Sequence, residues 1–564
     1  MSKRLYYYWI FIFLVPVLFN SCWHSSSVKE KDIVEEPEQL DTRKAANISD
    51  IVMYALDNEG KVDDSIRISN PSLVQSFYKD KDYKSLFSVQ DSTLPVADSL
   101  YLFIKHAREY GLFPSDYNFK NLTAIRSKLA VDSLSRKDAA LWSKEDVMLT
   151  DAFFSIATHL HIGRLAKDSI TLNPDSILGE PFFFNNLEDA LKKSTVRAVL
   201  DSLEPKIPEY LALRNAVKSF LDTADLATTY TWVSYPYKDS IAFTKMLIKR
   251  LKEYGAISDE VNEIDSTTLK TVVRKIQKTR GLTVDGKPGA QFVRMLNNTD
   301  PEKFKRIAIT LDRFKQLPHK MPETYVLVNI PAYQLKLWDS DTIVFDSKVV
   351  VGKPLTRTPV LNSKITNMVT YPQWTIPASI IAKEILPGLK KSPDYLARKG
   401  YLLIDSKGDE VDPYKINWAK YTKGIPYKVI QGSGDDNALG VLKFNFNNKY
   451  AVYLHDTNQR YYFSRGVRAL SHGCVRVQEW QKLAYYLIKR DSLSVEPPDE
   501  IKYGTDSLNA WLSRKEKHTL IIKNKLPVYL RYLGCEAKHG KIIFYDDIYG
   551  EDMLLRDKYF ANKN

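Results

Sequence analysis

One short stretch of the sequence holds residue types that could act together as a nucleophile and a base. Cys474 lies in the run Ser-His-Gly-Cys-Val-Arg, and His455 precedes this run by fifteen residues. A thiolate is a strong nucleophile, but an ordinary cysteine has a pKa of about 8.5 and is mostly protonated at neutral pH. An imidazole within hydrogen-bond reach can take the thiol proton and later return it to a leaving amine. The pair therefore predicts covalent catalysis through Cys474.

The neighbours of the cysteine suit this chemistry. Gly473 leaves the adjacent backbone unobstructed, so that amide N–H groups there could face a developing oxyanion. Arg476 offers a planar guanidinium that can pair with a substrate carboxylate, although it could instead form a salt bridge that holds the cysteine loop. Tyr453 lies two residues before His455, on the same face of a strand. We expect Tyr453 and Trp374 to form aromatic walls of the site.

Two other interpretations of these residues remain open at this point. Cys474 could be a buried structural cysteine with two hydrogen-bonded histidines nearby. Alternatively, His455, His472 and Cys474 could bind zinc, which would need a fourth ligand or an activated water with a glutamate base. No Cys-x-x-Cys or His-Glu-x-x-His motif accompanies them in the sequence. We therefore expect no metal and no organic cofactor.

The complete pattern, His-x15-Ser-His-Gly-Cys-Val-Arg, resembles the active-site signature of the L,D-transpeptidase (YkuD-like) family. Members of that family are cysteine enzymes that cross-link bacterial peptidoglycan. The resemblance runs from about residue 322 to 495 and includes the segments VLVNIPAYQLKLWD and YPQWTIPASI. It implies that Cys474 is the nucleophile and His455 the general base. It further implies that the Asp456 backbone orients the imidazole and that His472 and Arg476 line the site. We expect Ser471 and Gly473 to contact the substrate beside Arg476, and we count His472 among the catalytic residues.

The resemblance also implies a reaction and its partners. The Cys474 thiolate would attack the carbonyl between the third residue of a donor tetrapeptide stem, expected to be diaminopimelate, and its terminal D-Ala. An amine of a neighbouring acceptor stem would then resolve the thioester, giving a 3→3 cross-link. Water as the acceptor would make the protein an L,D-carboxypeptidase. A non-catalytic protein that anchors to the cell wall is a further alternative, and it would require a vestigial Cys474 site.

Composition places this site in a large, ordinary globular protein. A chain of 64.9 kDa predicts about three or four domains. The formal net charge of +13 could suit nucleic acid, anionic lipid or an acidic polymer. Because the sequence shows no nucleic-acid module or aromatic-basic repeat, we expect no nucleic-acid partner. A polymer with peptide carboxylates fits the charge better.

The amino terminus has the features of a targeting segment. Lys3 and Arg4 precede an apolar run from residue 5 to 19, which is short for a membrane span and typical of a secretory signal. A small residue before Cys22 resembles a lipoprotein signal, with a plain signal anchor as the alternative. We therefore expect lipidation of Cys22 and a membrane-anchored lipoprotein of the periplasmic cell envelope. Cys535 is then expected to be a small apolar strand residue rather than a disulfide partner of Cys474.

Apolar periodicity divides the remaining chain. It changes from helical to alternating at Tyr325, where short strands begin. We predict a multidomain α+β protein in which a mainly helical scaffold and a small three-helix peptidoglycan-binding-like module precede a mostly β, YkuD-like catalytic domain. The expected segments are a signal at 1–22, a linker at 23–70, the scaffold at 71–235, the module at 236–298, a connecting helix at 299–320 and the catalytic domain at 321–564, with a capping insertion at 377–430 and a carboxy-terminal extension at 496–564.

Overall fold

The structure is a computed structural model that describes residues 28–165, 178–193, 195–261, 263–493 and 503–563. The chain forms two compact units. One contains the described residues within Met1–Asp98 and Lys120–Asp151, and the other contains those within Ser99–Phe119 and Ala152–Asn564. The predicted signal segment and Cys22 lie outside the described residues. Within the described ranges, no helix has both the length and the apolar character needed to cross a membrane.

The first unit is helical and begins within the segment predicted to be a linker. Helix α1 (Leu40–Asp57) buries Leu40, Ile48, Ile51 and Val52, so the prediction of an extended linker over 23–70 is wrong for this part. The polar composition of the segment hid an apolar stripe at helical spacing. The unit continues with α2 (Pro71–Asp80), the strands β1 (Ser88–Val89) and β2 (Ser92–Thr93), most of α4 (Phe119–Val131), α5 (Ser133–Arg136) and the first parts of α3 and α6.

The second unit contains the remaining scaffold helices and a long central helix. Helix α13 (Asp300–Phe314) corresponds to the predicted connecting helix. Nearly every residue of α13 from Phe304 onward is buried, because its apolar side chains share one core with residues of α9 and of the large sheet. The scaffold helices of this unit are the end of α3 (Pro95–Lys105), the end of α6 (Ala139–His161), α7 (Glu180–Lys193), α8 (Val196–Ser202) and α9 (Pro208–Leu221).

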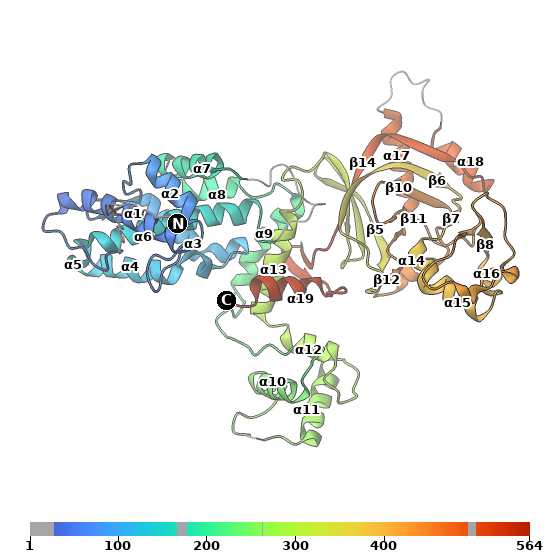
Figure 1. Cartoon of the computed structure of the whole chain (residues 1–564), viewed down its shortest axis with the longest axis horizontal. Helices are drawn as coiled ribbons and strands as arrows, with labels where there is room; N and C mark the ends of the chain where they lie inside the picture. Colours follow the sequence, from blue (N-terminus) through green and yellow to red (C-terminus); the bar gives the residue numbers. More distant parts are fainter. Residues whose placement is uncertain (1–27, 166–177, 194, 262, 494–502, 564) are drawn as a thin grey trace, which may run out of the picture. The chain divides into compact units, whose positions relative to one another are not determined.

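Residues 240–297 form the predicted three-helix module, labelled α10, α11 and α12 in Figure 1. Asp239 and Asp265 cap the first two helices by accepting hydrogen bonds from backbone N–H groups. Gln277 fixes the loop that follows the second helix, because it donates to Asp285 and accepts from the Gly286 N–H. The helices pack around an apolar core and span Ser240–Glu253, Ser266–Thr279 and Ala290–Asn297.

A nine-stranded, mostly antiparallel sheet forms the catalytic region. Its strand order is β12-β5-β13-β11-β10-β6-β14-β3-β4, and β5 also pairs with β4, which closes the sheet on itself. Helices α17 (Trp480–Leu493) and α18 (Thr505–Ser513) contribute apolar residues to its core. The strands are β3 (Thr324–Asn329), β4 (Gln334–Asp339), β5 (Thr342–Gly352), β6 (Leu361–Thr370), β10 (Leu442–Phe446), β11 (Leu454–His455), β12 (Ala469–Ser471), β13 (Val475–Val477) and β14 (Thr519–Arg531).

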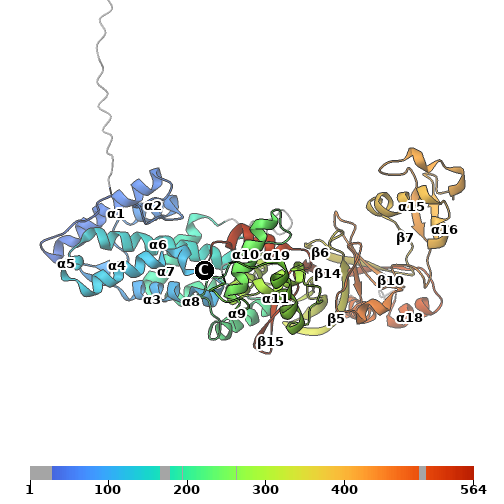
Figure 2. The same cartoon turned by 90° about the horizontal axis from the view of Figure 1, so that it is seen from below.

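The capping insertion forms a small subdomain with its own core. Three short strands pair in the order β7-β9-β8, and the apolar residues around them include Ile376, Leu389, Trp418 and Val429. Figure 2 shows α15, α16 and β7 grouped together. The elements are β7 (Trp374–Thr375), α14 (Ala378–Ile380), η5 (Ile381–Ile385), α15 (Leu386–Lys391), α16 (Tyr395–Lys399), β8 (Tyr401–Ile404), η6 (Pro413–Lys415), η7 (Trp418–Lys420) and β9 (Lys428–Gln431).

The carboxy-terminal extension ends the fold. Strands β15 (Cys535–Lys538) and β16 (Lys541–Phe544) form an antiparallel hairpin that turns at His539 and Gly540. Cys535 is fully buried and its thiol is free, as is that of Cys474. Cys535 therefore acts as a small core residue. The chain then forms α19 (Glu551–Leu555) and η10 (Arg556–Phe560).

Candidate active site

Strand pairing places three ionisable side chains in one row. Lys443 of β10 lies opposite His455 of β11 in the antiparallel register, and His455 lies beside Arg476 of β13 in the parallel register. Residues paired in this way share a face of the sheet. Cys474 immediately precedes β13, next to Arg476. The sheet therefore brings the predicted nucleophile and base together and flanks His455 with two cationic residues.

A cavity of about 80 Å³ contains both candidate catalytic groups. The capping subdomain contributes Pro377, Ser379 and Ile380 to its lining. Two residues predicted for the site, Asp456 and Gly473, are not among the lining residues. The predicted residues that do line it are Trp374, Tyr453, His455, Ser471, His472, Cys474 and Arg476.

The His455 imidazole is neutral in this environment. Its residue is 3% exposed, and burial, with the Arg476 charge as the next cause, lowers its pKa to about 3. The backbone of Asp456 and Leu439 opposes this shift by favouring the protonated ring. Nδ1 makes no hydrogen bond of good geometry to any described residue. A neutral imidazole is the form that can accept a proton.

The Cys474 thiol is protonated in the resting site. Burial raises its pKa, while the backbone of Tyr453 and the charges of Lys443 and Arg476 oppose the shift. Its Sγ lies 3.8 Å from the Ala451 carbonyl oxygen, which is a weak contact. Since both groups are neutral at pH 7, a thiolate on Cys474 would have to form by proton transfer to a base. The two nearby cations then stabilise the negative charge that appears on sulfur.

The turn before the nucleophile is fixed by its own residues. The Ser471 hydroxyl donates to the Cys474 carbonyl at 2.6 Å and accepts from the Gly473 N–H at 3.1 Å. Thr358 donates to the Gly473 carbonyl at 2.8 Å. Gly473 has a φ of 123°, a conformation that favours glycine. The Gly473 N–H donates to Ser471 in this structure. The expectation that backbone amides beside the sulfur face an oxyanion stays a prediction.

Asp456 supports the base strand rather than the cavity. Its carboxylate accepts from the Val441 N–H at 3.0 Å and lies 3.0 Å from an Arg460 nitrogen. Its own N–H donates to the Leu442 carbonyl at 2.9 Å, next to the β10–β11 pairing. These bonds hold the backbone on either side of His455. That the Asp456 backbone orients the imidazole therefore remains a prediction. The Asp456 side chain bonds instead to Val441 and Arg460.

Arg476 is held by neutral groups. Its Nη1 donates to Thr457 Oγ1 at 3.1 Å and to Gln459 Oε1 at 2.8 Å, and its guanidinium lies 5.3 Å from the centre of the Tyr462 ring. Over the described part of the chain, no carboxylate forms a salt bridge with it. The alternative of a salt bridge that holds the cysteine loop is therefore not realised. Its positive charge is uncompensated beside the cavity.

Two charged residues that contact the lining of the cavity were missed from the sequence. Glu384 of the capping subdomain lies 2.5 Å from His472 Nε2, so it ties the cap to the nucleophile loop. Lys443 Nζ lies 3.5 Å from the centre of the Tyr453 ring. The alternation of apolar and polar residues in LKFNF indicates that Lys443 faces away from the apolar core. It does not indicate that Lys443 pairs with His455. Nothing in the sequence around Glu384 indicated a partner 88 residues away.

Comparison with protein families assigns three regions. The L,D-transpeptidase catalytic domain, YkuD, matches residues 323–495, which include the whole cavity-forming motif. Residues 323–495 form a YkuD-family catalytic domain. A scaffold domain matches residues 72–217, and a domain described as a "putative peptidoglycan binding domain" matches residues 243–296. These regions confirm the predicted fold class and the predicted resemblance.

One curated relative agrees with this assignment. A curated protein of Haemophilus influenzae, described as a "putative L,D-transpeptidase", is 36% identical over 251 residues. The match covers 44% of this chain, and the chain spans about half (49%) of that relative. A solved structure of the Ldtfm-avibactam carbamoyl enzyme matches 38% of this chain and 51% of its own, at 11% identity and a TM-score of 0.16. A TM-score of 0.16 is too low to relate the two folds.

Proposed function

We propose that the protein is a peptidoglycan L,D-transpeptidase that forms 3→3 cross-links through a thioester on Cys474. The observation that carries this proposal is the shared cavity of the Cys474 thiol and the buried, neutral His455 imidazole. The match of a peptidoglycan-binding domain to residues 243–296 supports peptidoglycan as the substrate. The expected location is accordingly the cell envelope.

In the donor step, His455 takes the Cys474 proton as the sulfur attacks the carbonyl carbon of the third stem residue. The bond to the terminal D-Ala nitrogen breaks, and the proton passes to that nitrogen, so that D-Ala leaves as a neutral amine. A thioester remains on Cys474. Arg476, with no carboxylate partner in the described chain, is our candidate for binding the D-Ala carboxylate.

In the acceptor step, the side-chain amine of a second stem attacks the thioester carbonyl. His455 removes a proton from the amine and returns it to the departing sulfur, which restores the thiol. Water competes with the amine at this stage. The capping subdomain lines the cavity and is tied to it through Glu384 and His472, and exclusion of water favours cross-linking over hydrolysis.

Incubation of the full-length protein with tetrapeptide muropeptides, followed by mass spectrometry, tests this function. Dimers that lack one terminal D-Ala support transpeptidation. Monomeric tripeptides alone would support the L,D-carboxypeptidase alternative, and an unchanged substrate would favour the wall-anchoring alternative. The Cys474→Ala variant is the control, since it lacks only the sulfur that forms the thioester.

We also propose that Cys22 carries the lipid that anchors the protein. The basic residues and the apolar run that precede Cys22 support this. Metabolic labelling with a fatty-acid probe should mark the wild-type protein and not the Cys22→Ala variant. Label that persists in the variant would exclude Cys22 as the acceptor.

A further inference from the structure

The turn that follows β5 holds the loop of residues 471–474, which ends at the predicted nucleophile. The Lys353 N–H donates to the Ser471 carbonyl at 2.9 Å. The Thr358 hydroxyl donates to the Gly473 carbonyl at 2.8 Å. The turn therefore fixes two backbone carbonyls of this loop, one of them in the residue directly before the cysteine.

Thr358 is held in turn by a tyrosine that is distant in the sequence. Thr358 is 2% exposed, and its hydroxyl accepts from the Gly352 N–H at 2.9 Å. The Tyr549 hydroxyl accepts from the Thr358 N–H at 3.1 Å and donates to the Gly352 carbonyl at 2.7 Å. A Cβ at position 352 would lie 2.1 Å from the Thr356 carbonyl oxygen, so the turn admits only glycine there. Tyr549 therefore fixes the backbone from which Thr358 reaches the nucleophile loop.

Tyr549 belongs to the carboxy-terminal extension, outside the region that matches the catalytic-domain family. Its ring is buried in the core of the large sheet. Its N–H donates to the Tyr532 hydroxyl at 3.0 Å, and that hydroxyl donates to Asp547 at 2.6 Å. The segment that carries Tyr549 is therefore tied to the end of β14.

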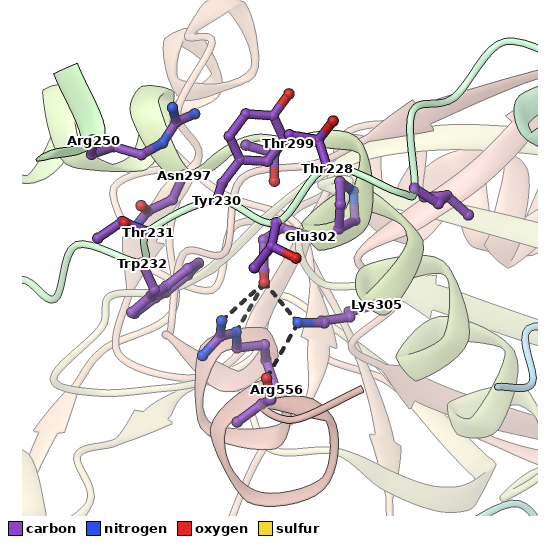
Figure 3. A pocket seen from close by; sticks show the side chains of 14 residues that line it. Thr228, Tyr230, Thr231, Trp232, Arg250, Asn297, Thr299, Glu302, Lys305 and Arg556 are labelled. Carbon is purple, nitrogen blue, oxygen red and sulfur yellow. Dashed lines mark hydrogen bonds and ion pairs between the residues drawn. The ribbon is translucent and has the colours of Figure 1, made fainter. Parts of the chain in front are cut away.

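Helix α13 anchors the extension at two further points. Asp552 of α19 accepts from Arg306 at 3.1 Å and also pairs with Arg313. Arg556, at the start of η10, donates to Glu302 at 2.8 and 2.9 Å, as the dashed lines in Figure 3 show. The position of Tyr549 is therefore set by segments that lie on either side of the matched catalytic domain in the sequence.

This network fixes the direction of one peptide bond. A trans peptide is planar, so its C=O and its N–H point in opposite directions. In the bond between Gly473 and Cys474 the carbonyl is held by Thr358, and the Cys474 N–H must then point away from Thr358. This N–H is one of the backbone amides beside the sulfur that are predicted to face an oxyanion.

We propose that Thr358 and Tyr549 are positioning residues that orient the Gly473–Cys474 peptide for acyl transfer. Neither side chain lines the catalytic cavity, so both act through the backbone of the nucleophile loop. The inference rests on the proposed function only in taking Cys474 as the nucleophile of an acyl transfer. When sulfur attacks a carbonyl carbon, the carbonyl oxygen gains negative charge, and an N–H that already points there stabilises it.

Two small reagents separate this role from a general effect on the sulfur. With p-nitrophenyl acetate, the sulfur bonds to the carbonyl carbon through an oxyanion intermediate and p-nitrophenolate leaves. With iodoacetamide, the sulfur displaces iodide and no oxyanion forms. The thiol loses its proton in both reactions, and neither reaction needs a peptide stem. Both rates are measured on the full-length protein, with Cys474→Ala as the background.

Thr358→Val and Tyr549→Phe each remove one hydroxyl with little change of shape. Each should slow acetylation by about tenfold or more while alkylation stays within about twofold of the wild type, because only acetylation needs the oriented N–H. Thr358→Ser keeps the hydroxyl and should recover most of the rate that Thr358→Val loses. The control Tyr486→Phe removes a tyrosine hydroxyl that donates to Asp339 at 2.7 Å in the same domain, and it should leave both rates unchanged.

Three results would overturn the proposal. The first is acetylation at the wild-type rate in both hydroxyl-deletion variants. The second is equal slowing of acetylation and alkylation, which would mean that the variants disturb the sulfur itself. The third is a Thr358→Ser variant as slow as Thr358→Val. If Tyr549→Phe does not fold, the comparison between the two Thr358 variants still decides the proposal.

Failure of this inference can be told from failure of the proposed function. Selective loss of acetylation in a protein that releases no D-Ala from tetrapeptide stems would support the positioning role and overturn only the peptidoglycan reaction. Release of D-Ala by the wild type, with normal acetylation in the variants, would overturn only the positioning role. The two measurements use different acyl donors and different readouts.

Discussion

Lowering the pH is expected to destabilise the sheet around His455. In the folded chain the pKa of His455 is about 3, while an unfolded histidine has a pKa of about 6.5. Between these values the unfolded state binds a proton that the folded state rejects, so stability falls as the pH falls. The stability that the neutral His455 contributes to the fold is fully present above about pH 6.5 and is lost progressively down to about pH 3.

The magnitude follows from the pKa difference. Each pH unit below about 6.5 costs about 1.4 kcal/mol, so the loss at pH 4.5 is about 2.7 kcal/mol. The His455→Gln variant has no group to protonate at this position and should lose this part of the pH dependence. Other ionisable groups titrate in both proteins, and the comparison between wild type and variant cancels their contributions.

Hydrogen–deuterium exchange at pH 7 and pH 4.5, corrected for the intrinsic exchange rate, measures the local stability. The segments to follow are the strands that surround the base, β10, β11 and β13. The wild type should lose about 2 to 3 kcal/mol more opening free energy in these segments than His455→Gln. Equal losses in both proteins would refute the buried, neutral state of His455.

Three further predictions concern the catalytic cavity. His455→Ala should slow acylation by about 10²-fold or more, as expected for loss of a general base, and His472→Ala should slow it less; stopped-flow acylation rates that rank in reverse would make His472 the base. Glu384→Gln weakens the solvent-exposed pair between Glu384 and His472, which is worth about 1 kcal/mol or less. The variant should therefore raise the ratio of hydrolysed to cross-linked product by about fivefold at most. A ratio that falls would contradict the role of the cap. Arg476→Lys should weaken use of tetrapeptide stems by about 1.5–3 kcal/mol while alkylation by a small thiol reagent stays near normal; equally slowed alkylation would assign Arg476 to the shape of the nucleophile loop.

Local sequence patterns predicted the parts of the fold that depend on nearby residues. The helical spacing of apolar residues predicted the three-helix module, and alternation from Tyr325 onward predicted the strands. The stretch from Tyr453 to Arg476 predicted six of the residues that line the cavity. In each of these cases the chemistry is encoded within a continuous stretch of the chain.

The remaining features depend on partners that are distant in the sequence. The pairing of Lys443 with His455 requires the strand register, and the contact between Glu384 and His472 requires the placement of the capping subdomain. Composition also misled the prediction for α1, since scattered charges surround its buried stripe. Long-range geometry, rather than residue type, determines these contacts.

The central claim is that Cys474 forms a thioester with the donor stem. Rapid acid quenching of the full-length protein with a tetrapeptide donor, followed by intact-protein mass spectrometry, tests it most directly. The wild type should gain the mass of the donor without its terminal D-Ala, mapped by digestion to Cys474, and Cys474→Ala should gain nothing while remaining within about 2 kcal/mol of wild-type stability. Turnover by Cys474→Ala, or a donor adduct mapped to another residue, would contradict the account.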